Sequence, residues 1–287
     1  EGTKSYYLHS FAVEQPDVNF RNPALKKAVF GELEFWLDRG VDGFRFDVIN
    51  WFIKDDQFRS NGWRLGKRPR PYDLQDHLYD RNRPETHGIV REIRSLLDGY
   101  GDRMCVGETF SEAPGDPELS ASYLGNGSDE LHLSFDFSLI FRAWSAKSFA
   151  EAIERWLDRV PAGAWPCHVL SNHDQSRIVT RFGGGDKGLR RARAAAVLLL
   201  TLRGTPFMYY GDELGMEDGR LSRRDIVDPA GLRYWPFFMG RDPERTPMQW
   251  TNGPNGGFSE ARPWLPVSTA GERNVELELR DPASMLS

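Results

Sequence analysis

Short apolar segments alternate with longer amphipathic segments along the whole of this 287-residue chain. Five of the apolar segments have the length and composition of buried strands: residues 41–49, 103–108, 131–137, 168–171 and 206–210. The segments that precede or separate them show the 3.6-residue period of helices: residues 23–39, 86–97, 148–157 and 189–203. Because parallel strands need helical crossovers, this alternation predicts an α/β fold in which the strands are parallel.

Local signals mark the start of two of these helices. Asn22 can accept a hydrogen bond from the first helical turn, and Pro23 suits the first helical position. The helical period then places Trp36 on the apolar face. Ser148 and Glu151 have the spacing of a capping box, so we expect the third helix to begin at that point.

An acidic residue lies at or just beyond the end of three strand-like segments. These residues are Asp47, Glu108 and Asp174. Side chains at the C-terminal ends of parallel strands can meet at one edge of a sheet, so we expect the three carboxylates to converge on one pocket. A pair of carboxylates flanking the scissile bond is the basic equipment of a glycosidase.

The alternation within residues 41–49 predicts where its side chains point. Phe44, Phe46 and Val48 fall on one face, and Arg45 and Asp47 fall on the other. A positive charge two residues from an inward carboxylate holds that carboxylate ionised and oriented. A strand-end ion pair without a catalytic role is the alternative for this segment taken alone.

Glu108 has a different sequence environment. It lies among Val106, Gly107 and Phe110, with no cation at the adjacent positions. Apolar surroundings favour the protonated form of a carboxyl, which is the form that a general acid needs. We therefore expect Asp47 to act as a nucleophile and Glu108 as the acid and base.

Five motifs, placed one after another along nearly the whole chain, resemble signature regions of the α-amylase superfamily of glycoside hydrolases. QPDVN at residues 15–19 and RDPERTPMQW at residues 241–250 are similar to segments of its oligo-1,6-glucosidase and α-glucosidase branch. GFRFDVIN at residues 43–50, GETF at 107–110 and SNHD at 171–174 resemble three signature regions of the whole superfamily. The resemblance runs through nearly the whole chain.

This resemblance implies a retaining, exo-acting α-glucosidase that hydrolyses terminal α-1,4 or α-1,6 bonds of short oligosaccharides or disaccharides. The catalytic residues would be Asp47, Glu108 and Asp174. Contacts to the sugar would come from Arg45, His173, Arg241 and Arg245, with one of the last two gripping the terminal glucose. A core or metal-ligating role is the alternative for His173. Val48, next to the expected nucleophile, accompanies activity on α-1,6 bonds in the relatives that the resemblance suggests.

Two other functions fit the same motifs. An isomerase or transglycosylase acting on sucrose or maltose would share all three carboxylates. A non-catalytic, partner-binding ectodomain of the kind found in amino-acid transporter heavy chains would use the same fold, but such proteins generally lack an intact catalytic set. The presence of Asp47, Glu108 and Asp174 opposes that second reading.

The resemblance also implies a TIM (β/α)8 barrel, of which this chain would supply about five of the eight βα units. Residues 1–21 resemble the exit from a small inserted domain, and residues 22–287 resemble the partial catalytic barrel. The upstream strands and a C-terminal β-domain would be missing. We therefore expect a fragment of a longer enzyme that is inactive when expressed alone.

Composition narrows the choice of partners and cofactors. A formal charge of −5 without a basic run argues against nucleic acid, and no apolar stretch approaches a membrane span. No spacing of His, Cys, Asp and Glu suggests a catalytic metal, so we expect no cofactor; a structural calcium site would lie in the missing upstream part. Cys105 and Cys167 fall in strand-like segments and are expected to be buried free thiols in a cytoplasmic protein.

Overall fold

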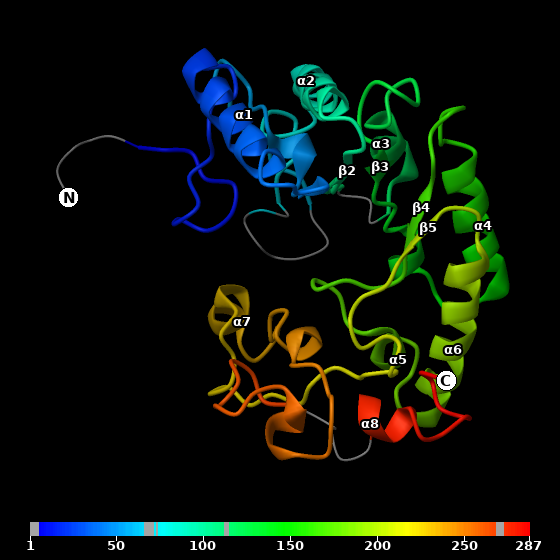
Figure 1. Cartoon of the computed structure of the whole chain (residues 1–287). Coiled ribbons are helices and arrows are strands. Elements are labelled where there is room, and N and C mark those ends of the chain that lie inside the picture. Colours follow the sequence, from blue (N-terminus) through cyan, green and yellow to red (C-terminus); the bar gives the residue numbers. More distant parts are fainter. Residues whose placement is uncertain (1–5, 66–71, 73, 112–114, 268–272) are drawn as a thin grey trace. The chain divides into compact units, whose positions relative to one another are not determined.

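The computed structural model describes residues 6–65, 72, 74–111, 115–267 and 273–287 (Figure 1). The chain has an α/β fold and divides into two compact units. Unit 1 comprises Glu1–Phe135 and Trp156–Pro166, and unit 2 comprises Asp136–Arg155 and Cys167–Ser287. Each unit has its own sheet and its own hydrophobic core, and each is described by itself below.

Unit 1 contains a sheet of three strands in the order β1 (Gly43–Phe46), β2 (Met104–Gly107) and β3 (Leu133–Ser134). Both strand pairs are parallel, as the sequence predicted, with Arg45 opposite Val106 and Val106 opposite Leu133. The helices of this unit are α1 (Pro23–Leu37), η1 (Ile49–Trp51), α2 (Glu85–Gly99) and α3 (Pro117–Ser122).

The start of α1 confirms the predicted cap, but its buried face differs from the prediction. The Asn22 side chain accepts a hydrogen bond from the Ala24 N–H at 3.0 Å, and Pro23 is the first helical residue. Leu37 is buried, whereas Trp36, which we expected on the apolar face, remains 50% exposed. Neighbouring helical positions differ by more than a quarter of a turn, so the side of α1 that buries Leu37 turns Trp36 outward.

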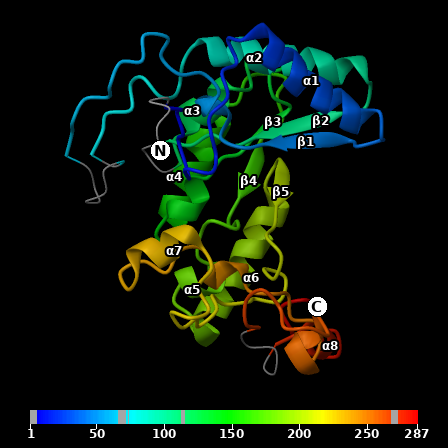
Figure 2. The ribbon, with the colours of Figure 1, turned by 90° about the vertical axis from the view of Figure 1, so that its left-hand side faces the viewer.

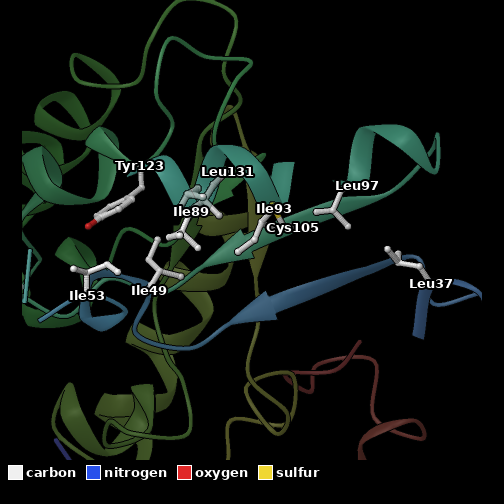
Figure 3. Close-up of a cluster of buried hydrophobic side chains, with 10 residues drawn as sticks. Leu37, Ile49, Ile53, Ile89, Ile93, Leu97, Cys105, Tyr123 and Leu131 are labelled. Carbon is white, nitrogen blue, oxygen red and sulfur yellow. The ribbon is translucent and has the colours of Figure 1, made fainter. Parts of the chain in front are cut away.

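The core of unit 1 lies between the sheet and the two long helices. In Figure 2, α1 and α2 lie on the same side of β1 and β2. Every fourth residue of α2 from Ile89 points into this core, and Figure 3 shows Ile89 and Ile93 beside Cys105 of β2. Burying a large aliphatic side chain contributes about 1.5–3 kcal/mol. Packing of α1 and α2 against the sheet therefore holds β1 and β2 in place.

Unit 2 contains two parallel strands, β4 (Cys167–Val169) and β5 (Thr205–Phe207). Its short 3-10 helices are η2 (Ser138–Phe141), η3 (Pro243–Arg245) and η4 (Pro254–Gly257). Its α-helices are most of α4 (Ala146–Leu157), α5 (Ile178–Arg181), α6 (Gly185–Thr201), α7 (Pro229–Tyr234) and α8 (Val275–Glu278). The core of the unit draws mainly on α4, α5 and α6, with buried Phe149, Val179 and Leu199 among its members.

Some predicted boundaries were wrong. The third predicted helix begins at Ala146, and the Phe149 N–H already donates to the Ser145 carbonyl at 3.0 Å. Ser148 is thus the third residue of α4 and cannot be its N-cap. The strands are shorter than predicted, because an apolar run does not reveal where backbone pairing stops. Among the described residues, the five strands pair as one sheet of three and one of two.

The two cysteines are buried free thiols, as predicted. Burial raises the pKa of the Cys105 thiol to about 11 and that of Cys167 to about 12. Within the described ranges, no helix combines the length and the apolar character that crossing a membrane requires.

Candidate active site

The ends of β1 and β2 carry two of the predicted catalytic residues. Asp47 directly follows β1, and Glu108 directly follows β2. The Glu108 N–H donates to the Phe46 carbonyl at 2.9 Å, and the Ile49 N–H donates to the Glu108 carbonyl at 2.9 Å. The backbone of Glu108 is therefore held on both sides by residues that flank Asp47.

The guanidinium of Arg45 contacts both carboxylates. Its Nη1 donates to Asp47 Oδ1, and its Nη2 donates to Glu108 Oε2. The contact of Arg45 with Asp47 was predicted from the sequence. The contact with Glu108 was not, because no cation is adjacent to Glu108 in the sequence. The second contact arises because the β1–β2 register sets Arg45 opposite Val106, two residues before Glu108. The carboxylates of Asp47 and Glu108 therefore both bind the planar guanidinium of Arg45 and share its one positive charge.

Asp47 and Glu108 differ in solvent exposure. The Asp47 side chain is 68% exposed, whereas the Glu108 side chain is 10% exposed. An exposed carboxylate is accessible to an incoming sugar, while burial favours the protonated form of a carboxyl. The buried carboxyl of Glu108 and the exposed carboxylate of Asp47 thus lie on either side of the same guanidinium.

The residues next to the two carboxylates have special backbone requirements. Val48 has a φ of 36°, in the left-handed region, which costs a β-branched residue on the order of 1–3 kcal/mol. The predicted strand therefore ends before Val48, because the chain turns there into η1. Gly107 is needed for another reason: a Cβ at this position would collide with the side chains of Leu131 and Ile49.

The third predicted carboxylate, Asp174, lies in unit 2 between β4 and α5. Its Oδ1 accepts from Arg245 Nη2 at 2.6 Å and from Arg241 Nη1 at 3.2 Å. His173 Nε2 lies 3.5 Å from the same oxygen, and Arg245 Nε donates to the His173 carbonyl at 2.7 Å. Both arginines that the sequence left as alternatives therefore contact Asp174.

A buried carboxylate that the sequence analysis missed, Asp228, holds Arg241. Its Oδ2 accepts from the Arg241 backbone N–H at 2.8 Å and from Arg241 Nε at 3.0 Å. Its Oδ1 caps α7 by accepting from the Ala230 N–H at 3.1 Å. Burial opposes ionisation of Asp228, but the hydrogen bonds from Arg241 and Ala230 together with the Arg241 charge outweigh it, so the pKa of Asp228 is lowered. The pair Asp228-Pro229 is a helix-start signal, but nothing local in the sequence indicates the contact with Arg241.

Two further buried carboxyls accompany the Asp174 segment. Asp212 accepts a hydrogen bond from Ser171 Oγ, and burial raises the pKa of Asp212 to about 6. Burial raises the pKa of Glu244, in η3, to about 8, and the negative charges of Asp218 and Asp174 act in the same direction. Glu244 is therefore mostly protonated at neutral pH, which limits the negative charge around Asp174.

The structure thus brings the predicted site residues together as two groups, one in each unit. The group in unit 1 is Arg45, Asp47 and Glu108, and the group in unit 2 is His173, Asp174, Arg241 and Arg245. Convergence of all three carboxylates on one pocket stays a prediction. Chemically, the group in unit 1 combines an exposed carboxylate with a buried one, which suits a nucleophile and an acid.

The family model for the alpha amylase catalytic domain matches residues 1–287. The chain belongs to the α-amylase family. It is 38% identical to a probable alpha-glucosidase of Rhizobium meliloti (strain 1021), over 98% of this chain and 52% of that protein. It is 35% identical to an oligo-1,6-glucosidase of Parageobacillus thermoglucosidasius, over 99% of this chain and 55% of that protein.

Two solved structures resemble the chain as well. The alpha-glucosyl transfer enzyme XgtA matches with a TM-score of 0.90 and 38% identity, over 98% of this chain and 53% of that one. The trehalulose synthase MutB from Pseudomonas mesoacidophila MX-45 matches with a TM-score of 0.80 and 28% identity, over 98% and 54%. The chain therefore spans about half the length of the relatives that it matches.

Proposed function

We propose that this chain carries the catalytic carboxylates of a retaining, exo-acting α-glucosidase that hydrolyses terminal α-1,4 or α-1,6 bonds of short oligosaccharides or disaccharides. The observation that carries this proposal is the Arg45 guanidinium, which contacts both Asp47 and Glu108. Retaining glycosidases keep their two carboxyls about 5–5.5 Å apart, whereas inverting ones leave roughly 6.5–9.5 Å for a water molecule. Two carboxylates bound to one guanidinium favour the closer arrangement.

The proposed reaction has two steps. In the first, protonated Glu108 gives its proton to the glycosidic oxygen while the Asp47 carboxylate attacks the anomeric carbon, which releases the leaving sugar and forms a glucosyl ester. In the second, the Glu108 carboxylate removes a proton from water, the water cleaves the ester, and α-glucose and the Asp47 carboxylate are released. Two displacements at the same carbon retain its configuration.

The position of Arg45 suits this charge balance. Before the first step, ionised Asp47 and protonated Glu108 present one negative charge to the guanidinium. After it, Asp47 is a neutral ester and Glu108 is ionised, so the guanidinium again faces one negative charge. A single fixed cation that contacts both groups therefore matches the negative charge as it passes from Asp47 to Glu108, with little reorganisation.

In this proposal, Asp174 binds hydroxyl groups of the terminal glucose and His173 donates to the same sugar. The arginines have distinct positions. Arg245 ties Asp174 to the backbone of His173, whereas Arg241 ties Asp174 to buried Asp228. Arg241 has the more exposed side chain, 41% against 21%, so we assign the contact with glucose to Arg241.

Glucosyl transfer is the alternative function. The similar structures include an alpha-glucosyl transfer enzyme and a trehalulose synthase. A transferase would share the first step and would then use a sugar hydroxyl in place of water to cleave the Asp47 ester. Product analysis with sucrose and with maltose separates the two, because a hydrolase yields free glucose and a transferase yields a new disaccharide or trisaccharide.

We also propose that the five strands, which are parallel within each of the two sheets, belong to a TIM (β/α)8 barrel, with residues 22–287 as part of the catalytic barrel and residues 1–21 leading into it from a small inserted domain. The parallel pairing of β1 with β2 and of β4 with β5 supports this, as does the family match over the whole chain.

The proposed function is tested with the full-length enzyme and two variants. We expect Asp47→Asn to abolish hydrolysis of maltose and isomaltose, because an amide does not form the glucosyl ester. Asp42→Asn is the matched control, since Asp42 precedes the same strand and its side chain is 90% exposed. Proton NMR of the first product should show α-glucose. Wild-type rates in Asp47→Asn, or β-glucose as the first product, would refute the assignment.

A further inference from the structure

Asn50, the last residue of the GFRFDVIN motif, has a buried side chain with every polar hydrogen-bonding group engaged. It is 0% exposed. Its Nδ2 donates to the Phe110 carbonyl at 2.8 Å and to Asn82 Oδ1 at 2.7 Å. Its Oδ1 accepts from the Phe110 N–H at 2.9 Å. Neither Asn50 nor Asn82 was singled out by the sequence analysis.

These bonds continue the pairing of β1 with β2 beyond the point where the backbone of β1 turns away. Backbone pairing ends at Glu108, whose N–H and carbonyl bind Phe46 and Ile49. Val48 then turns the chain, so no main-chain segment of β1 faces Phe110. The Asn50 amide occupies that place, because it offers one acceptor and one donor to the N–H and carbonyl of one residue, as a neighbouring strand does.

The same amide also contacts the last part of the long connection between η1 and α2. The second hydrogen bond that Asn50 Nδ2 donates goes to Asn82 Oδ1, and the Asn82 backbone N–H donates to the Asn50 carbonyl at 2.8 Å. Asn82 has a φ of 54°, a left-handed conformation that asparagine and glycine tolerate best. Asn50 therefore ties the peptide two residues after Glu108 to the end of that connection.

We propose that Asn50 is a positioning residue for the acid and base Glu108. It fixes the main chain on the C-terminal side of Glu108, while the β1 backbone fixes Glu108 itself, so that the carboxyl stays in place to protonate a leaving group. This inference rests on the function proposed above. A misplacement of about 1 Å in a reacting group can lower a rate on the order of 10²-fold.

The test uses the full-length enzyme and two kinds of substrate. Maltose has a poor leaving group and needs the proton from Glu108, whereas 2,4-dinitrophenyl α-glucoside does not. The quantity compared is kcat/KM, which covers the steps up to leaving-group release. Asn50→Asp is the deciding variant: it is isosteric, still accepts from the Phe110 N–H and, as a carboxylate, donates neither of the two amide bonds. We expect its kcat/KM for maltose to fall roughly 10²-fold, and that for the dinitrophenyl glucoside to fall less than about tenfold.

Two further variants make the result specific. Glu108→Gln should show the same substrate-dependent loss, and failure of that control would count against the proposed function and not against Asn50 alone. Asn82→Gly removes the Asn82 Oδ1 acceptor, tolerates the positive φ and leaves the Asn50–Phe110 bonds, so it should show no substrate dependence. Equal losses on both substrates in Asn50→Asp, no loss on either, or failure of this isosteric variant to fold would each overturn the positioning role.

Discussion

Asp228 binds Arg241 through both the backbone and the side chain, with its Oδ2 2.8 Å from the Arg241 nitrogen and 3.0 Å from Nε. Only Nη1 of this arginine is directed at Asp174, at 3.2 Å. Asp228 is 4% exposed and also caps α7, so it links a helix, an arginine and the expected sugar-binding carboxylate of unit 2. The contact of Arg241 with Asp174 therefore depends on a residue outside the recognised motifs.

We predict that Asp228→Asn in the full-length enzyme raises KM for maltose about tenfold and lowers kcat much less, because Arg241 loses its charged support and contacts the bound sugar less well. Removing one partner of a buried ion pair also costs stability, by roughly 3–5 kcal/mol at most. Steady-state kinetics and urea unfolding measure the two effects. Asp225→Asn, at a half-buried carboxylate of the same segment that accepts from Ser222, is the control and should leave KM unchanged. Unchanged KM in Asp228→Asn would contradict the link.

Arg45→Lys tests the shared cation of unit 1. A lysine ammonium is a point charge and cannot bind two carboxylates in the planar, forked manner of a guanidinium. We expect kcat to fall roughly 10²-fold while the melting temperature stays close to that of the parent. Arg39→Lys is the matched control, because Arg39 lies just after α1, where it stacks on Phe35 and donates to the Phe35 carbonyl. Full activity in Arg45→Lys would show that two-point binding is dispensable.

The buried carboxyl of Glu244 predicts a pH-dependent stability. Its pKa in the folded protein is about 8, above the ordinary value of 4.5, because burial favours the neutral form. The folded state therefore holds a proton that the unfolded state has released, so stability falls as pH rises from about 4.5 to about 8 and the loss is complete above that.

Glu244→Gln removes this penalty. We expect its melting temperature to exceed that of the parent at pH 9 and to match it near pH 4, with the difference growing between these values. Glu260→Gln, at an exposed position, should follow the parent throughout. Calorimetry across this range decides the matter, and a difference that is constant with pH would contradict the raised pKa.

The two cysteines should be inert towards thiol reagents in the native protein. The raised pKa values of about 11 for Cys105 and about 12 for Cys167 leave little thiolate at pH 8, and both side chains are buried. We expect both to react with a disulfide reagent in urea and neither to react within minutes before unfolding. Rapid labelling of the native protein would show that at least one of the two segments opens readily.

Much of the fold and part of the site follow from local sequence signals. The parallel pairing, the Asn22 cap of α1 and the buried cysteines were predicted because period, capping residues and β-propensity act over a few residues. The Arg45–Asp47 contact was predictable for the same reason, since two residues on one strand share a face.

The contacts that could not be predicted depend on register and on segments distant in the sequence. Arg45 reaches Glu108 only because β1 and β2 pair in one particular register. Asn50 reaches Phe110 across the same pair of strands. Alternation does not reveal the single left-handed residue Val48 within a predicted strand, and the capping-box spacing that begins at Ser148 also occurs inside helices.

The covalent intermediate tests the central claim most directly. Full-length enzyme would be mixed with 2,4-dinitrophenyl α-glucoside, in the Glu108→Gln background that slows cleavage of the ester, then quenched in acid, digested and analysed by mass spectrometry. We predict one added glucosyl unit on the peptide that contains Asp47, and none when Asp47→Asn is combined with the same background. A glucosyl unit on a peptide without Asp47, or β-glucose formed with no adduct at any time, would contradict Asp47 as the nucleophile of a retaining α-glucosidase.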